Sequence, residues 1–213
     1  MSLWFDTIAP VAAPTGLTIL QHPNIFNAST NSLSITLPGT TAGSLLVAAV
    51  ATAGTWATMN FSTTAGSTSA WTTDQSGINA GNGGCAVGHA TVSASGSITV
   101  TFTSTGPPLS VSLVVFELAN ASGYDTALSA NVGPSSGTTT TPSITPAASG
   151  ELIIGLLGGL AVNGSSAPFT FTTTPTQSNG IAYSIAPTAA AIACTFTGVQ
   201  TGFPAETMTA AYH

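Results

Sequence analysis

Two hydrophobic patterns recur along the chain, and both are typical of β-strands. In the segments 33–37 and 97–102, apolar and polar residues alternate strictly, as they do in a strand with one face on a core and one in solvent. The runs 45–50, 111–116 and 152–157 are apolar throughout, which indicates strands covered on both faces. Turn residues rich in Gly and Pro separate these segments, and no stretch shows a helical period. The patterns predict a protein that is mostly strand and almost free of helix.

An internal repeat relates the early part of this pattern to the late part. The segment 34–47 combines a short Ser-Ile-Thr strand, a proline turn and a Gly-initiated apolar run, and 143–154 has the same succession. Further on, 99–103 resembles 193–197. Two similar halves of about four strands each are what a two-sheet jelly roll contains. The repeat therefore predicts a sandwich assembled from two related halves.

These patterns together predict the fold class and the domain organisation. We expect an all-β protein, a two-sheet antiparallel β-sandwich of the jelly-roll type with an extended N-terminal arm. The arm covers residues 1–20, and a single domain covers 21–213 with halves at about 31–125 and 141–213. Four strands alone would bury little apolar surface, which favours one sandwich over two separate domains.

The first twenty residues differ from the rest because they lack alternation and contain Pro10 and Pro14. Trp4 and Phe5 are large aromatic side chains in this segment, and both require burial. They can fold back onto their own domain or anchor in a neighbouring subunit, as an extended arm would. We take Trp4 and Phe5 as the candidate assembly arm.

The polar part of the composition is unusual for a globular protein. The chain has no Lys or Arg and only six acidic residues, while 37 Thr and 25 Ser supply most of its polarity. The charged fraction is 3%, against roughly 25% in an ordinary domain. Hydroxyl and amide groups must therefore keep the protein in solution, and copies repel one another only weakly. Such a surface tolerates close self-association.

The absence of cationic side chains excludes several functions. Neutralising nucleic-acid phosphates or anionic lipid headgroups requires Lys or Arg, so we expect no nucleic-acid partner. Schiff-base lysines and P-loop phosphate binding are also impossible. The longest apolar stretch, 152–162, is too short for a membrane span and contains glycines, so we expect no membrane insertion. Residues 1–20 carry no cation and include Asp6, unlike a secretory signal. Either a signal has already been removed, or the protein does not use the general export pathway. If Met1 is the natural start, we expect release by cell lysis.

Cys85 and Cys194 are the only thiols in the chain. In an exterior β protein they could form one disulfide, which would contribute about 4 kcal/mol in the chain-entropy model. The alternative is that both are small buried apolar residues. Spacing alone cannot decide between these interpretations.

One segment offers candidate metal ligands. Asp74, Ser76 and Asn79 provide oxygen ligands around a glycine turn, an arrangement that calcium can use. Calcium loops usually carry more acids than this one. The three histidines are scattered, without the His or Cys spacing of a zinc site. We therefore predict no metal and no cofactor, with this calcium site as the candidate exception.

Catalytic chemistry has little support in the sequence. Glu117 and Glu151 both flank apolar strands and could face each other as the carboxylate pair of a glycosidase. The alternative is that each lies at a strand end and accepts hydrogen bonds from a turn. His89 follows a glycine in an expected strand, and the sequence has no nucleophile elbow. We therefore expect a structural histidine with its hydrogen bonds satisfied rather than the histidine of a catalytic triad. We predict that the chain is not an enzyme and assign no catalytic residue.

Aromatic side chains leave carbohydrate binding open. Trp56, Trp71 and Tyr124 could act as stacking platforms for glycans, with Asn and Asp side chains reading the sugar hydroxyls. Aromatic residues make up only 7% of the chain, however, and most aromatic side chains of β-sandwiches are buried in the core. Glycans are therefore possible partners rather than expected ones.

Three short motifs carry a resemblance to known proteins. They lie at 43–47, at 115–118 with Tyr124 and Asp125 after it, and at 150–155. They resemble a loosely defined family of bacterial and phage jelly-roll-like β-sandwich domains found in virion and surface proteins, and the resemblance covers roughly residues 31–196. It implies a sandwich in an exposed or assembled setting and no catalytic residues. The absence of Lys and Arg is more extreme here than in that family.

These observations favour a structural function outside the cell. We expect a non-enzymatic subunit of a viral or extracellular assembly, above all a phage capsid decoration protein or related virion protein. Its partners would be copies of itself and other capsid or filament proteins, and its location the virion surface or the extracellular space. A cell-surface filament subunit and a secreted carbohydrate-binding adhesin are the alternatives.

Overall fold

A computed structural model describes residues 16–63, 68–107, 109–173, 177–186 and 188–213. Strands make up 65% of the described residues and pair antiparallel. The same residues contain no helix, and hence none that could cross a membrane. The predicted all-β antiparallel sandwich is thus confirmed. Residues 1–15, with Trp4 and Phe5 of the predicted arm, lie outside the described part of the chain.

The first half of the chain forms two sheets. Sheet I contains, in spatial order, β3 (Ser32–Thr40), β8 (Gly96–Thr105) and β5 (Thr58–Thr63). Sheet II contains β9 (Leu109–Ala119), β4 (Leu45–Ala53), β7 (Gly83–Thr91) and β6 (Thr72–Asn79), with β1 (Thr18–Gln21) and β2 (Asn24–Thr30) both paired to the free side of β9. Thr18–Gln21, mostly assigned to the arm from the sequence, is therefore a strand of sheet II.

The second half repeats this plan. Sheet III contains β10 (Tyr124–Val132), β17 (Ala205–Tyr212), β12 (Leu152–Val162), β15 (Gln177–Ile185) and β14 (Thr170–Phe171) in spatial order. Sheet IV contains β11 (Thr138–Thr140), β16 (Thr195–Thr197) and β13 (Gly164–Ser165). The strand order of sheets III and IV matches that of sheets II and I, with β10 in the place of β1 and β2. The repeat seen in the sequence thus corresponds to a repeat of topology.

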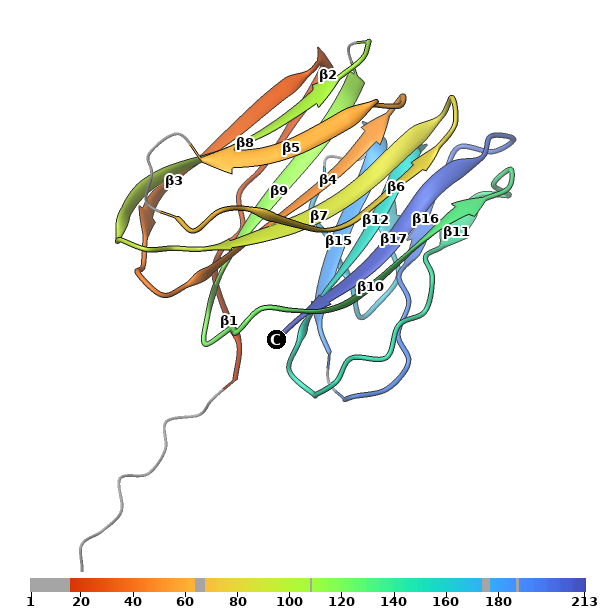
Figure 1. Ribbon diagram of the computed structural model, residues 1–213. Coiled ribbons are helices and arrows are strands. Elements are labelled where there is room, and N and C mark those ends of the chain that lie inside the picture. Colours follow the sequence, from red (N-terminus) through yellow and green to blue (C-terminus); the bar gives the residue numbers. More distant parts are fainter. Residues whose placement is uncertain (1–15, 64–67, 108, 174–176, 187) are drawn as a thin grey trace, which may run out of the picture.

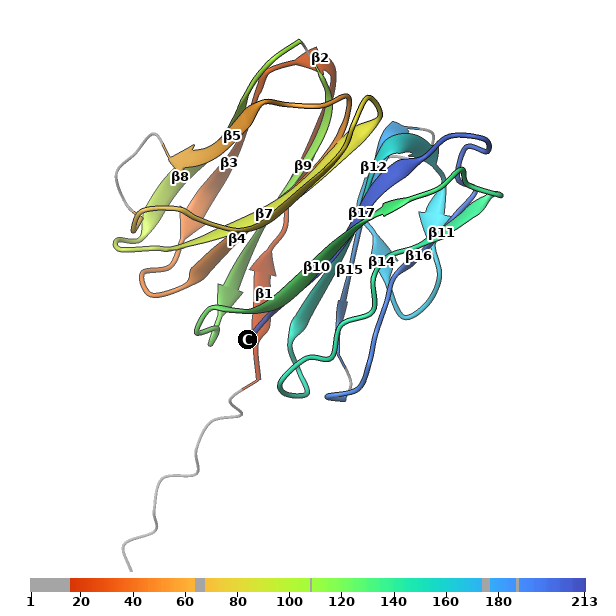
Figure 2. The ribbon, with the colours of Figure 1, turned by 45° about the vertical axis from the view of Figure 1, so that its right-hand side comes forward.

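The four sheets stack as layers in the order I, II, III, IV (Figures 1 and 2). The sequence predicted two sheets; the structure instead has one pair of sheets for each half. The physical reason is that each half supplies both strand types, alternating strands for an outer sheet and fully apolar strands for an inner one. The two inner sheets then bury their remaining apolar faces against each other.

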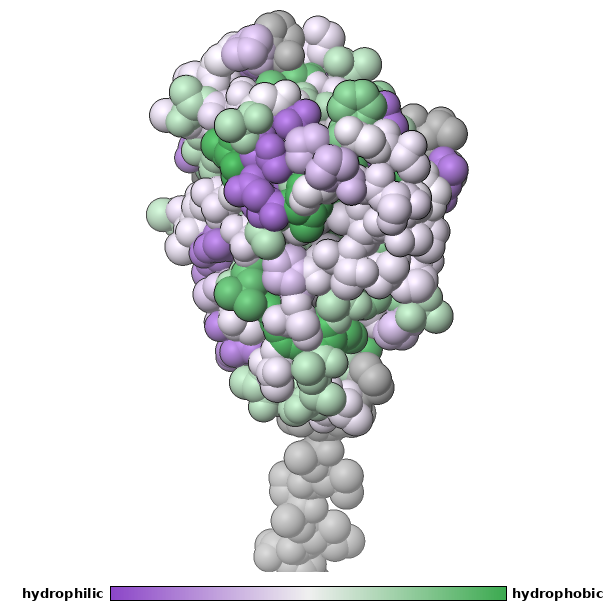
Figure 3. Space-filling model, turned by 90° about the vertical axis from the view of Figure 1, so that its right-hand side faces the viewer, coloured by the Kyte–Doolittle hydropathy of each residue, from purple (hydrophilic) through white to green (hydrophobic). Residues whose placement is uncertain are grey.

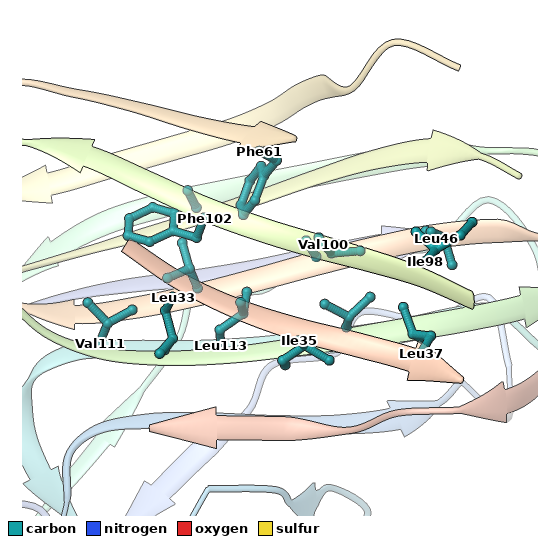
Figure 4. Close-up of a cluster of buried hydrophobic side chains, with 14 of the residues drawn as sticks. Leu33, Ile35, Leu37, Leu46, Phe61, Ile98, Val100, Phe102, Val111 and Leu113 are labelled. Carbon is teal, nitrogen blue, oxygen red and sulfur yellow. The ribbon is translucent and has the colours of Figure 1, made fainter. Parts of the chain in front are cut away.

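The first core, between sheets I and II, shows how alternation positions an outer strand. Leu33, Ile35 and Leu37 of β3 point inward, while the residues between them are exposed. Figure 4 shows them meeting Leu46 and Leu113 from the inner strands. One face of each outer strand is therefore apolar and the other polar, as predicted from the alternation.

The apolar runs form inner strands buried on both faces, as the sequence predicted. In β4, Leu46 faces the first core, while Leu45 and Val47 face a central core between sheets II and III. In β12, Ile154 faces the central core and Ile153 faces a third core between sheets III and IV. The central core thus fuses the two halves into one stack.

Candidate functional sites

Asp74 is the centre of a polar cluster between the two inner sheets. The pairing of β6 with β7 shifts register between Thr73 and Gln75, and such a bulge re-aims a side chain. The Asp74 side chain is only 2% exposed, and its two oxygens lie 2.8 and 2.9 Å from Nδ1 of His89 on β7. Tyr212 Oη of β17 donates to Asp74 Oδ2 at 2.8 Å. Burial, followed by the charge of Asp74, raises the pKa of Tyr212.

This cluster joins the halves and engages Asp74, one of the residues of the candidate calcium site. Asp74, Ser76 and Asn79 lie along one extended strand, where five steps of about 3.3 Å separate the first from the last. Asp74 is engaged by His89 and Tyr212, and Asn79 Nδ2 donates to the Ala205 carbonyl at 3.0 Å. The three side chains therefore do not converge, and the calcium assignment is corrected. His89 is a satisfied histidine, as expected.

Glu117 accepts hydrogen bonds from a turn, which was the alternative to its catalytic interpretation. It is 1% exposed, and its Oε1 accepts from the Thr41 amide at 2.7 Å and from Ser44 Oγ at 2.8 Å. Its Oε2 accepts from Gln21 Nε2 at 2.6 Å. Three donors thus stabilise the buried carboxylate and fix the turn before β4.

Glu151 belongs to a group that the sequence did not reveal. Ligand atoms of Asp125, Glu151 and His213 all lie within 4.8 Å of one another. Asp125 is at the start of β10, Glu151 immediately precedes β12, and His213 immediately follows β17. Only strand pairing in sheet III brings these distant positions together. The one sequence signal was the repeat, which places Glu151 where the first half has Ser44.

The aromatic residues proposed for glycan stacking are engaged in packing. Trp56 is 6% exposed and lies in the first core, edge-on to Phe102. Trp71 packs against the same core, and Tyr124 packs against Tyr212 beside the central core. Trp56 is therefore a core residue, and its assignment as a glycan platform is corrected. Trp71 and Tyr124 are only partly buried, and glycan stacking by these two rings stays a prediction.

The two cysteines are free and fully buried, on opposite sides of sheet III. Cys85 lies in the central core and Cys194 in the third core. Burial, and for Cys85 also the nearby Glu206, raises both pKa values, that of Cys194 to about 12. The disulfide left open by the sequence is not formed, and the thiols are apolar packing groups.

The solvent face of sheet I carries rows of hydroxyl groups bonded across strands. Ser34 pairs with Thr101 at 2.9 Å and Thr36 with Thr99 at 2.8 Å, between β3 and β8. Thr58 of β5 pairs with Thr105 of β8 at 2.7 Å. These pairs give a polar surface that is neutral and ordered.

Of the six large apolar side chains that are exposed among the described residues, four lie on edge strands, and the other two are Ile185 of β15 and Phe203 in the loop before β17. Leu20 lies on β1, Ile25 on β2, Ile78 on β6 and Leu128 on β10, with exposures between 37% and 49%. All four strands are at the edges of sheets II and III. Gln75 Nε2 of β6 donates to Ser129 Oγ of β10 at 3.2 Å, so β6 and β10 form one composite edge. We call this the β6–β10 edge.

Comparisons with protein-family models, with curated proteins and with solved structures found no match. The sites therefore rest on their own geometry.

Proposed function

We propose that the chain is a non-enzymatic structural subunit of a viral or extracellular assembly, most closely a phage capsid decoration or related virion protein. The observation that carries this proposal is the edge of the stack. Natural β proteins protect long edge strands with Lys, Pro or strong charge, because unpaired strand edges join other chains. The β6–β10 edge has no Lys and instead presents Ile78 and Leu128 to solvent.

The rest of the surface supports the same proposal. Without Lys or Arg, and with a net charge of −6 on 213 residues, copies can approach closely. Figure 3 shows one face on which weakly polar residues predominate, with hydrophobic residues scattered among them and strongly hydrophilic ones confined to a few clusters. Such a face suits contacts made by shape and hydroxyl hydrogen bonds. Contacts of this kind are nearly insensitive to salt.

The proposal gives an expected result for association in solution. Sedimentation velocity of the full chain should show association that increases with concentration and changes little with added salt. Leu128→Lys together with Ile78→Lys should weaken this association by about tenfold or more, because a charge on an edge must be desolvated in any contact. Ala190→Lys is the matched control, since Ala190 lies in an exposed loop and should leave association unchanged.

Two outcomes would contradict this expectation. One is a parent chain that stays monomeric at every concentration, and the other is equal association of edge and control variants. Electron microscopy of the associated material separates the structural alternatives, because contacts that close give discrete particles and contacts that do not close give filaments.

A further inference from the structure

The Asp125–Glu151–His213 group is held in place by the backbone around it. The Ala147 amide donates to Asp125 Oδ2 at 3.0 Å, and the Ala148 amide donates to Glu151 Oε1 at 2.6 Å. His213 exchanges two main-chain hydrogen bonds with Gly123, at 2.9 and 3.1 Å. Each carboxylate therefore uses one oxygen for positioning and keeps the other for a ligand. This is how outer partners orient metal ligands.

Glu151 has a buried oxygen without a partner. The residue is 1% exposed, and no described residue forms a hydrogen bond with its Oε2. A buried charged oxygen without a partner is costly, and here a second carboxylate lies close by. The chain has no Lys or Arg that could lie beside these two carboxylates. The group is therefore short of positive charge.

The first half of the chain provides an internal comparison. In strand register, Leu45 opposite Leu118 corresponds to Leu152 opposite Tyr212. Ser44 therefore corresponds to Glu151, and the alanine after Leu118 corresponds to His213. The turn there is held by Glu117, whose oxygens have three donors. The fold consequently does not require an orphaned carboxylate or a histidine at this position.

Two of the three residues of the group also face a pocket that is open to solvent. Glu151 and His213 line a pocket of about 240 Å³ together with Asn120, Ser122 and Ser149. His213 is exposed, whereas Glu151 is buried at the inner side. A cation can therefore enter from solvent and keep a water molecule on its outer side.

We propose that Asp125, Glu151 and His213 bind one divalent cation, and that zinc is the ion that fits them best. Three protein ligands of oxygen and nitrogen type with an open fourth position are typical of zinc, whereas calcium and magnesium prefer oxygen alone. The ion supplies the charge that Glu151 Oε2 lacks. It ties the start of β10, the turn before β12 and the end of β17 into one unit. The sequence predicted no such site because its ligands come from three separate segments.

The test uses the full chain after treatment with a chelator, followed by calorimetric titration with zinc, calcium or magnesium chloride. We expect one zinc per chain and a rise in the unfolding temperature, because an ion that binds only the folded state stabilises it. His213→Ala and Asp125→Asn should each weaken zinc binding by about 100-fold or more and remove the rise. His22→Ala is the matched control, since His22 is an exposed histidine elsewhere and its loss should leave zinc binding intact.

The competing account is a proton shared between Asp125 and Glu151, which needs no metal. That account predicts that the parent chain gains stability on acidification but shows no saturable response to zinc, and this result would overturn the proposal. Zinc binding that survives both His213→Ala and Asp125→Asn would overturn it equally. Circular dichroism of each variant verifies that the strand content is unchanged.

Discussion

Replacing Gly158 with alanine is expected to lower the free energy of unfolding by about 3 kcal/mol, near the upper end for overpacked cores. A Cβ at Gly158 would lie 2.5 Å from the Gly84 carbonyl oxygen and 2.9 Å from that of Thr52. Both are backbone atoms of sheet II, so neither can rotate away. The inner sheets would have to separate locally, which loosens the central core. Chemical denaturation of the parent and variant measures this effect.

Gly133→Ala is the matched control for this variant. No heavy atom lies within 4 Å of the expected Cβ, and the backbone there is not in the left-handed region. We expect no loss, or a gain of about 0.4–1 kcal/mol from the stiffer unfolded chain. Equal stability of Gly158→Ala and the parent would show that the two inner sheets are not in backbone contact.

Glu206→Gln is expected to stabilise the protein at neutral and higher pH. Glu206 is 1% exposed, its Oε2 has no described hydrogen-bond partner, and burial raises its pKa from 4.5 to about 7. The folded state thus binds this proton more tightly than the unfolded state. The stability from this group is fully present below about pH 4.5 and is lost as the pH rises through about 7. Glutamine is neutral at every pH and removes this loss.

The expected gain in unfolding free energy follows from the size of the pKa change of Glu206, which corresponds to up to about 3 kcal/mol above pH 7. Unfolding free energies measured from about pH 5 to about pH 8 should fall less for Glu206→Gln than for the parent. Glu117→Gln is the contrasting control, because Glu117 is equally buried but has three donors. That variant should destabilise the protein. A Glu206→Gln profile parallel to that of the parent would contradict the assignment.

The inner and outer strands were predictable because a strand buried on one face alternates apolar and polar residues, whereas a strand buried on both faces is apolar throughout. The apolar run at 45–50 is an inner strand, and the alternating segment at 33–37 is an outer one. The predicted number of sheets was wrong because we interpreted the repeat as two halves that together form one two-sheet sandwich. In the structure each half forms a pair of sheets of its own. Nothing in either half alone shows that its inner sheet packs against a second inner sheet.

Site residues were harder to predict because they depend on contacts between distant strands. Gly77 made the segment 74–79 resemble a loop, whereas in β6 it leaves space for the Glu206 carboxylate, with which any side chain would collide. Asp125 and His213 are brought to Glu151 only by the pairing of β10, β17 and β12. The hydrophobic pattern and the spacing of residues in the sequence do not show which residues of different strands come into contact.

The central claim, that the chain is a subunit of an extracellular or viral assembly, is tested most directly by immunogold electron microscopy. An antibody against the purified protein is applied to cultures of the organism that produces it, including particles released on lysis. The account predicts gold at regular positions on the outer surface of particles or filaments. Gold confined to the cell interior, with released particles and cell surfaces unlabelled, would contradict it.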